Sequence, residues 1–482
     1  MILGCTSDAG KSFLCAALCR YFANKGIRTA PFKAQNMSNN AAALAGGGEI
    51  GRAQFLQAQA ARIIPDARMN PVLLKPSGDT KSQVILNGHF SPELTALPWL
   101  ERKKHLWPEV KNSLTGLINE YELVIIEGAG SPAEINLREG DIVNLSVALF
   151  CNADVFLAAD IDRGGAFAHL YGTWACFSEN EKKLVRGVVL NKFRGDPALL
   201  GNAADWLNEK TGINACVIIP FVPHILPEED AFFHATGHTH FPATGPAYSP
   251  SEKHIPEKKI SIALILYPWA SNLEEFDPLY HEKGVEITAI KENIRLDLFD
   301  AIILPGSKVT WKSLDFLRSS GLASSIVKVS RNGVLIHGVC GGMQMLGNYI
   351  DDPEGVESQN AKERVNGLSL LDITTELFPQ KITGQRTIQY EGSAVSGYEI
   401  RAGRTMPGKN AVPVLPDGLG FQQGNVSGVY LHGLFDNTVY RRKFLSRCGL
   451  PGEKKDWPAM LDAELNKAAE LIVSSGWSRL LP

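Results

Sequence analysis

The segment from Gly333 to Gly347 constrains the fold of this chain more than any other. An apolar run, Val334 to Ile336, leads into the tight corner Gly-Val-Cys-Gly-Gly at residues 338–342, and a helix-like stretch follows. Small residues on both sides of Cys340 let the backbone turn sharply between a strand and a helix. The pattern predicts a thiol exposed at the carboxyl end of a strand, beside backbone N–H groups that could hold an oxyanion and a helix start that favours the thiolate.

A thiol at such a corner needs a base before it can act as a nucleophile. His432 ends another apolar run and is the best candidate to take the proton of Cys340 and return it to a leaving amine. His337 lies inside the strand, so we interpret it as structural. Gly306 follows the predicted strand Ala301–Leu304, and its N–H group could complete an oxyanion hole. The alternatives are an inert buried thiol and a core histidine, and the corner disfavours both.

A glycine-rich loop at the other end of the chain predicts a phosphate-binding site. Residues 4–12 read Gly-Cys-Thr-Ser-Asp-Ala-Gly-Lys-Ser, after a very short strand and before a helix-like segment. Backbone N–H groups of such a loop cradle phosphates, and the helix start adds its dipole. Lys11 would reach the β- and γ-phosphates, and the Ser12 hydroxyl would bind Mg²⁺. The remaining nucleotide-binding candidates in the loop are Gly4, Thr6, Asp8 and Gly10.

Polar residues at the ends of other predicted strands support this site. Glu127 ends an apolar strand, where a carboxylate can bind Mg²⁺ directly or through water. Lys33 lies just past the second strand, where a cation could neutralise transferring phosphate charge, and Asn191 could face the nucleotide base. Open α/β sheets bind ligands at the carboxyl edge, so three further residues are candidates for a substrate edge: Asp160, Asp162 and Arg163. Lys33 could instead be a solvated lysine, Glu127 a capping or turn acid, and Asn191 part of a turn at the strand end.

Short β-branched runs alternate with helix-like segments in both halves of the chain, which predicts parallel sheets with helices on both faces. In the first half we expect helices over Lys11–Asn24 and Gly51–Arg62, and strands over Ile27–Phe32, Gln83–Leu86, Leu123–Ile126, Val155–Ala159, Val185–Leu190 and Cys216–Ile219. In the second half we expect strands over Ile260–Leu266, Glu286–Ile290, Ala301–Leu304 and Val334–Ile336. The fold class is therefore α/β, with two doubly wound domains.

The break between the two domains is marked by a change of composition. Residues 226–257 contain five prolines and little periodicity, which is typical of a linker. We expect a P-loop domain over residues 1–225 and a second domain over 258–482. The apolar periodicity from Trp457 to Trp477 predicts a C-terminal helix packed on the second domain. Four linker histidines could form a metal site, although their spacing fits no ligand pattern well: His234, His238, His240 and His254.

Composition argues against several classes of protein. A formal charge of −3 argues against a nucleic-acid-binding surface. No apolar stretch approaches the length of a membrane span, and the first residues lack the basic region of a signal peptide. The eight cysteines include no C-x-x-C pair, which indicates buried thiols and one nucleophile rather than a disulfide or zinc framework. We expect a cytoplasmic protein without nucleic-acid or membrane partners, and the oligomeric state stays open.

Blocks in both halves together resemble the glutamine-hydrolysing cobyric acid synthase family over essentially the whole chain. The first half carries Thr6–Ser12, Pro31–Ser38, Gly51–Gln54, Asn70–Pro76, Glu127–Glu134, Asp160–Gly165 and Leu190–Gly195. Its loop spacing is similar to that of dethiobiotin synthetase. The second half looks like a class I glutamine amidotransferase, which implies a flavodoxin-like sheet, and carries Leu304–Lys308, the Cys340 corner, Gly397–Ile400 and Tyr430–Gly433.

The resemblance implies a two-site reaction. Cys340 attacks the side-chain amide of L-glutamine and releases ammonia, with Gly306, Gly341 and Gln344 binding glutamine or the oxyanion. MgATP phosphorylates a substrate carboxylate at the P-loop, and ammonia converts it to an amide. The family substrate is a corrinoid, adenosylcobyrinic acid a,c-diamide, whose b, d, e and g carboxylates are amidated to give cobyric acid in cobalamin biosynthesis. ATP and Mg²⁺ are then not prosthetic groups, and no protein ligand to the corrin cobalt is expected.

Two positions depart from the family pattern. Leu434 stands where class I members carry a glutamate, two residues after the histidine, so no third member of the Cys–His site can be named. Arg401 and Ala402 stand where the family more often has histidine. Alternative enzymes are the a,c-diamide synthase and another ATP-dependent amidotransferase, such as one acting on a cell-wall lipid. A partition-type P-loop switch with an inactive second domain is also possible, but such switches usually place an extra lysine before the position of Lys11.

Overall fold

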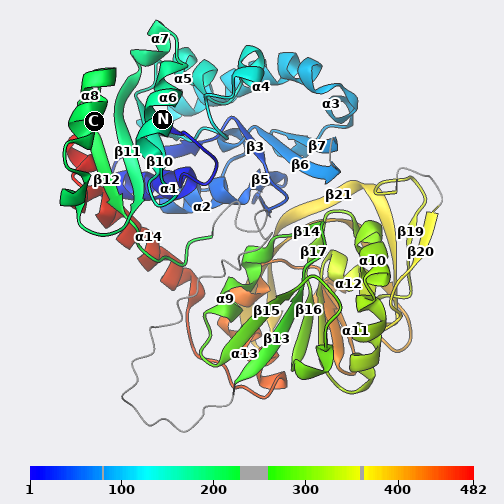
Figure 1. Cartoon of the computed structure of the whole chain (residues 1–482). Helices are drawn as coiled ribbons and strands as arrows, with labels where there is room; N and C mark the ends of the chain where they lie inside the picture. Colours follow the sequence, from blue (N-terminus) through cyan, green and yellow to red (C-terminus); the bar gives the residue numbers. More distant parts are fainter. Residues whose placement is uncertain (79–80, 228–258, 359–362, 482) are drawn as a thin grey trace, which may run out of the picture.

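The computed structural model describes residues 1–78, 81–227, 259–358 and 363–481. Two domains lie against each other, the N-terminal one from blue to green and the C-terminal one from light green to orange (Figure 1). The expected linker falls almost entirely on residues 228–258, so the linker and its four histidines lie outside the described residues. In the described ranges, no helix combines the length and the apolar character that a membrane crossing needs.

The N-terminal domain is built on a parallel sheet with the strand order β1 (Ile2–Gly4), β10 (Val155–Asp160), β11 (Val185–Phe193) and β12 (Cys216–Pro220). The parallel pair β2 (Thr29–Phe32) and β9 (Leu123–Ile126) adjoins β1 through a bridge between Ile2 and Glu127. Alternate residues of β10 enter two apolar clusters, Phe156 on one face and Leu157 on the other. Both faces are therefore covered, as a parallel sheet requires.

The helices of this domain begin with α1 (Lys11–Asn24), whose bounds match the prediction, and α2 (Arg52–Ala60), which packs against it. The others are α3 (Pro92–Ala96), α4 (Trp99–Glu120), α5 (Leu145–Cys151), α6 (Ala166–Ala175), α7 (Glu179–Lys182) and α8 (Ala203–Thr211). Residues of α1 and α2 share the cluster of Phe156, whereas residues of α5, α6 and α8 share that of Leu157. The predicted arrangement of helices on both faces is confirmed.

One predicted strand lies outside the parallel sheet. Gln83–Leu86 belongs to β7 (Lys81–Leu86), which pairs antiparallel with β6 (Val72–Gly78). The chain between these two strands is far too short for a crossover, so only an antiparallel pair can form. They belong to a small sheet with β3 (Gln35–Met37) and β8 (His89–Phe90), and a second ladder joins β4 (Ala41–Ala43) to β5 (Glu49–Gly51).

The C-terminal domain is built on a seven-stranded sheet. Its order is β15 (Val285–Ile290), β13 (Ile260–Ile265), β16 (Ala301–Leu304), β18 (Leu335–Val339), β25 (Val426–Val429), β24 (Gly420–Gln423) and β23 (Val412–Leu415). The first five strands are parallel, and their order is the 2-1-3-4-5 of flavodoxin-like sheets, so the predicted fold class is confirmed. Its helices are α9 (Asp277–Tyr280), α10 (Thr310–Ser319), α11 (Leu322–Arg331), α12 (Gly341–Leu346) and α13 (Thr438–Arg447).

A long hairpin of the C-terminal domain reaches the N-terminal domain. The strands β21 (Ile373–Tyr390) and β22 (Ser393–Pro407) form it, in a sheet with β19 (Tyr349–Asp352) and β20 (Glu363–Asn366). Lys381 of β21 pairs with Glu49 of β5 at 3.0 Å. Gln385 donates a hydrogen bond to the carbonyl of Ala43 in β4 at 3.2 Å. A short ladder, β14 (Ala270–Ser271) with β17 (Gly306–Ser307), completes the domain.

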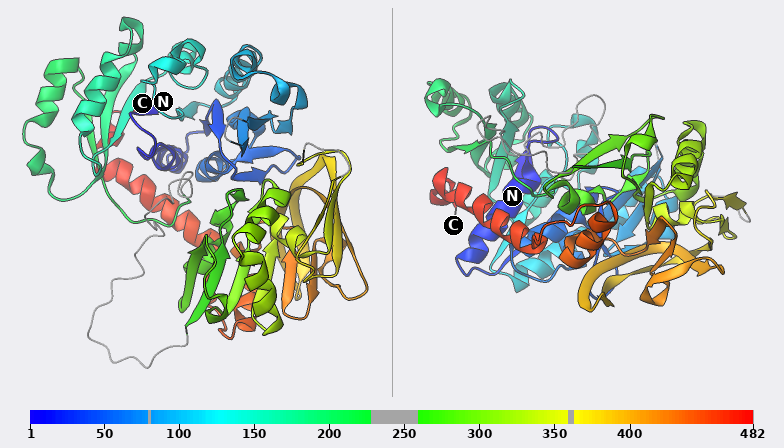
Figure 2. Two further views of the ribbon diagram at one scale, coloured as in Figure 1. Left: turned by 45° about the vertical axis from the view of Figure 1, so that its right-hand side comes forward. Right: turned by 90° about the horizontal axis from the view of Figure 1, so that it is seen from below.

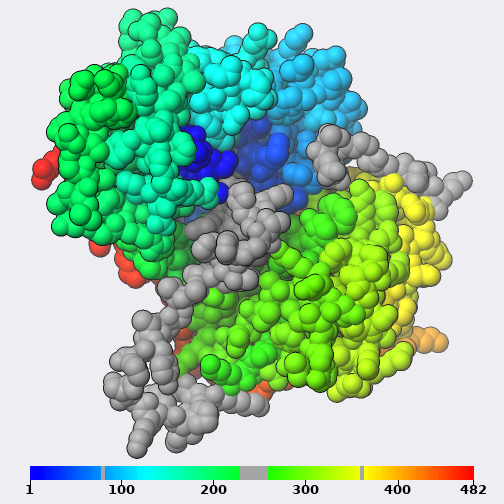
Figure 3. Space-filling view, in the orientation of Figure 1, coloured from blue at the N-terminus to red at the C-terminus, as the bar shows by residue number. Residues whose placement is uncertain are grey.

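The C-terminal helix α14 (Trp457–Ser474) packs on the N-terminal domain, which corrects the expectation that it covers the second domain. It lies along α1 (Figure 2). Leu465 and Ile472 enter the apolar cluster of α1, and the buried Arg20 pairs with Asp462 at 2.7 Å. The periodicity of an amphipathic helix reveals that one face is covered but not which domain covers it. Helices near the two ends of the chain thus pack against each other. The two domains abut (Figure 3).

Candidate functional site

Cys340 lies at the turn between β18 and α12, as the corner predicts. Its backbone has φ 49° and ψ −107°, a left-handed conformation that costs about 1–3 kcal/mol in a residue other than glycine. The glycines around it allow close approach of the chain. A Cβ atom on Gly338 would lie 2.6 Å from the backbone of Gly342, and one on Gly342 would lie 2.0 Å from the carbonyl oxygen of Leu304. The turn therefore holds the thiol in a fixed place at the end of the sheet.

His432 follows β25, the strand beside β18, so the sheet topology brings it to Cys340. Both side chains line one pocket, and the Cys340 thiol donates to the carbonyl of Ile400 at 3.7 Å. The His432 ring stacks on Tyr398 with 5.3 Å between centroids, and the backbones of these two residues exchange hydrogen bonds of 2.9 and 3.1 Å. Tyr398 belongs to the Gly397–Ile400 block, whose place in the fold is thus to hold the histidine ring.

A carboxylate that the sequence analysis did not identify completes this group. Oε1 of Glu275 lies 2.9 Å from Nδ1 of His432, and Oε2 accepts a hydrogen bond from the backbone N–H of Gly433 at 3.1 Å. Glu275 lies on the short 3-10 helix η4 (Leu273–Phe276) and is buried. The position expected for an acid, Leu434, is in the apolar core instead. No local pattern marks Glu275 beyond an acidic pair inside an apolar turn.

The environment of His432 favours its protonated form. Burial lowers the pKa of the imidazole, but the charge of Glu275 and the contact with Cys340 outweigh this effect and raise it to about 10. An imidazolium beside a thiol stabilises the thiolate. His337 has a different environment, because its Nδ1 contacts the Ser427 hydroxyl at 3.0 Å and burial lowers its pKa to about 3. His337 is therefore neutral and remote from this chemistry.

A pocket opens in front of Cys340, and its lining includes Gly341 and Gln344 of the predicted residues and Ser307, the neighbour of Gly306. A Cβ atom on Gly306 would lie 3.1 Å from Cε1 of His432, and one on Gly341 would lie 2.9 Å from the backbone nitrogen of Ser307. Gln344 is buried, and its amide bonds to the hydroxyls of Thr310 and Tyr430 at 3.3 Å each. The three predicted residues therefore surround the thiol and imidazole.

Both domains line this pocket. The N-terminal domain contributes Asn39, Lys75 and Gln83, and the C-terminal domain contributes Lys308 and Glu357. Burial lowers the pKa of Lys75 and Lys308, whereas it raises the pKa of Glu357 to about 7. The two amines and the carboxyl group of this pocket are, when ionised, complementary to a zwitterionic amino acid.

The phosphate-binding loop connects β1 to α1 as predicted. Nζ of Lys11 folds back over the loop, 3.5 Å from the carbonyl of Thr6 and 3.3 Å from that of Gly130, and a Cβ atom on Gly4 would lie 2.9 Å from it. Gly10 has φ 86°, and a Cβ atom there would lie 2.1 Å from the amide of Asn191. Asn191 donates to the carbonyl of Ala9 at 2.9 Å, so its observed contact is with the loop.

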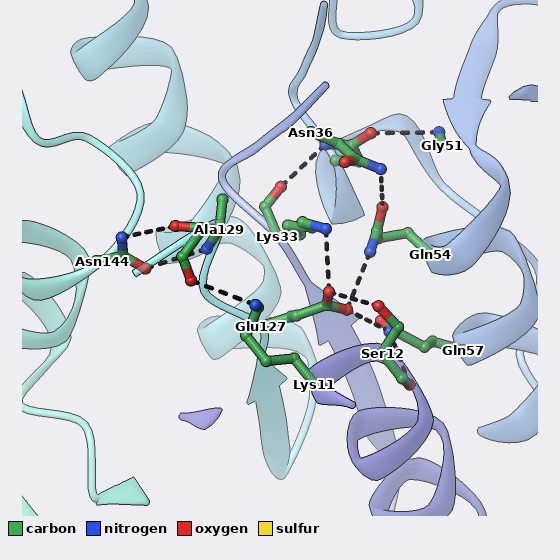
Figure 4. Close-up of polar contacts among 12 residues, drawn as sticks. Lys11, Ser12, Lys33, Asn36, Gly51, Gln54, Gln57, Glu127, Ala129 and Asn144 are labelled. Atoms are coloured by element: carbon green, nitrogen blue, oxygen red, sulfur yellow. Dashed lines mark hydrogen bonds and ion pairs between the residues drawn. The ribbon is translucent and has the colours of Figure 1, made fainter. Parts of the chain in front are cut away.

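Glu127 lies at the centre of a buried polar cluster beside this loop (Figure 4). Its Oε1 accepts hydrogen bonds from Ser12 at 2.8 Å and from Lys33 at 3.0 Å. Its Oε2 accepts from Gln57 at 2.5 Å and from Gln54 at 3.3 Å. Burial raises the pKa of Glu127, but Lys33 and these donors together hold it below its usual value. The two glutamines were not predicted as site residues, although the Gly51–Gln54 block includes one of them.

The oxygens at this cluster fit a bound Mg²⁺. The Ser12 hydroxyl and the Glu127 carboxylate are hard ligands, 2.8 Å apart, at the start of a helix where phosphates bind. Lys33 and Lys11 place two cationic side chains beside the same position. The cluster therefore offers oxygen and cationic groups of the kind that bind a nucleoside triphosphate with its metal.

The three candidates for a substrate edge lie beside the loop. Asp160 ends β10, with Lys192 at 3.2 Å and Arg163 at 3.5 Å. Arg163 also reaches the carboxylate of Asp8 in the loop at 2.9 Å. Asp162 is partly exposed and pairs with Arg194 at 3.2 Å. These charged side chains line the carboxyl edge of the sheet, next to the nucleotide position.

Family models match both domains. Residues 1–232 match the CobQ/CobB/MinD/ParA nucleotide binding domain, and residues 261–440 match the CobB/CobQ-like glutamine amidotransferase domain. A solved structure of a glutamine amidotransferase aligns over 39% of this chain and 99% of its own, with 21% identity and a TM-score of 0.33, which is too weak a likeness to bear on the assignment.

Curated relatives match nearly the whole chain. The cobyric acid synthase of Deinococcus radiodurans is 47% identical over 100% of this chain and 99% of its own. Those of Paracidovorax citrulli and Variovorax paradoxus are each 47% identical, over 92% and 91% of this chain and 91% of their own. At this identity and coverage, with both domains matched, the chain belongs to the cobyric acid synthase family.

Proposed function

We propose that this chain amidates the b, d, e and g carboxylates of adenosylcobyrinic acid a,c-diamide with nitrogen from glutamine, and so forms cobyric acid. One observation carries the proposal. A thiol–imidazole–carboxylate site and a P-loop site lie in abutting domains of a chain that is 47% identical, end to end, to a curated cobyric acid synthase. The activities below are assigned to the residues that the fold brings together.

The thiol site would release ammonia. The thiolate of Cys340 attacks the amide carbon of glutamine, and the N–H groups of Gly341 and Gly306 bind the oxyanion that forms. His432 gives its proton to the departing nitrogen, which leaves as ammonia, and the enzyme keeps a thioester. Water then attacks the thioester with His432 as base, which yields glutamate and restores the thiol. Glu275 holds the imidazole by Nδ1, so that Nε2 faces the sulfur.

The pocket around the thiol suits glutamine itself. Glutamine carries an α-ammonium and an α-carboxylate at one end, and Glu357, Lys308 and Lys75 line the pocket. Glu357 would pair with the ammonium, and the lysines with the carboxylate. The buried amide of Gln344 would orient the side-chain amide toward Cys340.

The P-loop site would activate the corrinoid carboxylate. A substrate carboxylate oxygen attacks the γ-phosphorus of ATP, and ADP leaves. Ammonia then attacks the acyl phosphate, and phosphate leaves as the amide forms. Lys11 and Lys33 neutralise charge on the transferring phosphate, and Asp160, Asp162 and Arg163 are proposed to face the corrinoid. Bound by Ser12 and Glu127, Mg²⁺ would supply further neutralisation of phosphate charge.

Substrate discrimination tests the proposal against its closest alternative. Purified protein is incubated with MgATP and glutamine, and with either cobyrinic acid or its a,c-diamide. We expect amidation of the a,c-diamide at four positions, with one ADP and one glutamate released for each amide. Amidation of cobyrinic acid at only two positions would identify an a,c-diamide synthase instead. Release of glutamate with both corrinoids unchanged would support the glutaminase activity but refute a corrinoid as the substrate.

A further inference from the structure

The turn that carries Glu275 is held in place by the other domain. Asn272, which precedes this turn, has the left-handed conformation φ 55°, ψ 42°. Its side-chain oxygen accepts a hydrogen bond from the backbone N–H of Ala41 at 3.0 Å. Its backbone N–H donates to the side-chain oxygen of Asn40 at 2.9 Å. Two reciprocal hydrogen bonds from the P-loop domain thus fix the start of η4, three residues before Glu275.

An ion pair fixes the next part of the same turn. Nε of Arg52, the first residue of α2, lies 3.4 Å from Oε1 of Glu274, whose side chain is only 8% exposed. Within the described residues, neither oxygen of Glu274 accepts a hydrogen bond. A buried carboxylate without hydrogen bonds is costly unless a charge compensates it. Arg52 supplies that charge, although burial still raises the pKa of the Glu274 carboxyl, and the pair ties α2 to the residue that precedes Glu275.

Arg52 also reaches the histidine from a second side. Its guanidinium lies 6.0 Å from the centre of the Tyr398 ring, and that ring stacks on His432. The backbone N–H of Arg52 donates to the carbonyl of Asn40 at 3.2 Å, which links it to the reciprocal pair at Asn272. One arginine of the P-loop domain thus lies beside Tyr398, which stacks on the imidazole, and beside Glu274, the residue before Glu275.

The helix that carries Arg52 is itself anchored at the nucleotide site. Gln54 and Gln57 of α2 donate to Oε2 of Glu127, and Gln57 also donates to the carbonyl of Ser12 at 3.4 Å. Arg52 and Gln57 are separated by five residues, or about 7.5 Å along the helix axis. The first two turns of α2 therefore contact Glu127 at the nucleotide site and lie beside Glu274 and Tyr398 near the thiol site.

We propose that Arg52 is a positioning residue of the glutamine-hydrolysing site, supplied by the P-loop domain, which holds Glu275 against His432 through Glu274. The inference rests on the proposed glutaminase and goes beyond it, because it makes that site dependent on docking of the other domain. It also assigns a role to the Gly51–Gln54 block. Arg52 lies outside the pocket lining that the described residues form, so it acts on the imidazole and not on glutamine.

The test compares Arg52→Met with Arg52→Lys in the full-length protein. Amidation is measured with glutamine and, separately, with ammonium chloride as the nitrogen source. We expect Arg52→Met to lower kcat with glutamine about tenfold, a loss of about 1.4 kcal/mol, with KM for glutamine and the ammonium-dependent rate within about twofold of wild type. Arg52→Lys should recover part of the loss. The matched control is Arg62→Met, an exposed arginine just beyond the same helix.

A double-mutant cycle separates positioning from a general loss of docking. Glu274→Leu alone removes the ion-pair partner of Arg52, whose side chain is 19% exposed, and should also lower kcat with glutamine. The pair Arg52→Met with Glu274→Leu should lose no more than either single variant. Equal rates for Arg52→Met and wild type, or multiplicative losses in the pair, would overturn the inference. Absence of glutamate release in wild-type protein would instead refute the proposed function.

Discussion

Glu275 and His432 are 157 residues apart in the sequence, yet a carboxylate oxygen of the first lies 2.9 Å from Nδ1 of the second. The contact joins the turn before α9 to the end of β25. It turns a cysteine–histidine pair into a three-membered site. Together with Cys340, Glu275 raises the pKa of the imidazole to about 10 against the effect of burial. The acid of this site is therefore supplied from the start of the domain rather than from beside the histidine.

Replacing Glu275 tests that relationship through the pH dependence of glutaminase activity. Because the carboxylate raises the pKa of His432, Glu275→Gln should lower that pKa, and the imidazolium should lose its proton at a lower pH. The alkaline limb of kcat/KM for glutamine then moves to lower pH, and the maximal rate falls about 10- to 100-fold. Glu275→Asp should lie between the two proteins. An unchanged alkaline limb in Glu275→Gln would show that the carboxylate does not support the base.

Cys340→Ala separates the two sites. Without the thiol no thioester forms, so glutamine-dependent amidation should fall by at least about 10³-fold. Amidation with ammonium chloride should remain near the wild-type rate, because the P-loop site is untouched. Parallel assays with the two nitrogen sources measure both outcomes. A folded variant that loses both activities would contradict the division of labour.

Gln57→Leu tests the carboxylate cluster from the nucleotide side. The variant removes a hydrogen bond that orients Glu127, and the loss of such an outer partner typically costs about tenfold in metal affinity. KM for MgATP should therefore rise about tenfold with either nitrogen source. Gln59→Leu is the matched control, because this glutamine lies on the same helix with its side chain exposed. A similar change in both variants would indicate a general effect on α2 and not on Glu127.

Trp477→Ala tests how the C-terminal segment packs on the N-terminal domain, because Trp477 begins the short 3-10 helix Trp477–Arg479 just after α14. Trp477 is fully buried and packs edge-on against Phe156 of β10, with 5.4 Å between ring centroids. Removing a buried tryptophan should lower the free energy of unfolding by about 3–5 kcal/mol. Trp206→Ala, at a side chain that is 40% exposed, should cost far less. Denaturant unfolding of the two variants gives the comparison, and equal losses would contradict the packing of the C-terminal segment on this domain.

The sequence predicted where helices and strands lie better than which other elements they pair with or pack against. The bounds of β9, β16 and α1 match because an apolar run or a loop–helix junction defines each of them locally. The Cys340 corner was also recognisable, since glycines at 338 and 342 are required by close backbone contacts. Gln83–Leu86 was correctly predicted as a strand but placed in the wrong sheet, because periodicity does not determine pairing.

Long-range contacts explain what could not be predicted. Glu275 lies in a turn without a motif, and only the 2-1-3-4-5 strand order brings it to His432. The helix α14 has an apolar stripe that either domain could have covered, and the structure places it on α1. The sequence analysis named Arg52 only within the Gly51–Gln54 block, because its ion-pair partner Glu274 belongs to the other domain.

Mass spectrometry of the corrinoid tests the central claim most directly. Protein, MgATP and adenosylcobyrinic acid a,c-diamide are incubated with glutamine labelled with ¹⁵N in its side-chain amide. The account predicts that four carboxylates in turn become amides, that the reaction stops at cobyric acid, and that the product carries four ¹⁵N atoms in place of the ¹⁴N atoms found after a parallel incubation with unlabelled glutamine. A corrinoid that stays unchanged while labelled ammonia accumulates would contradict it.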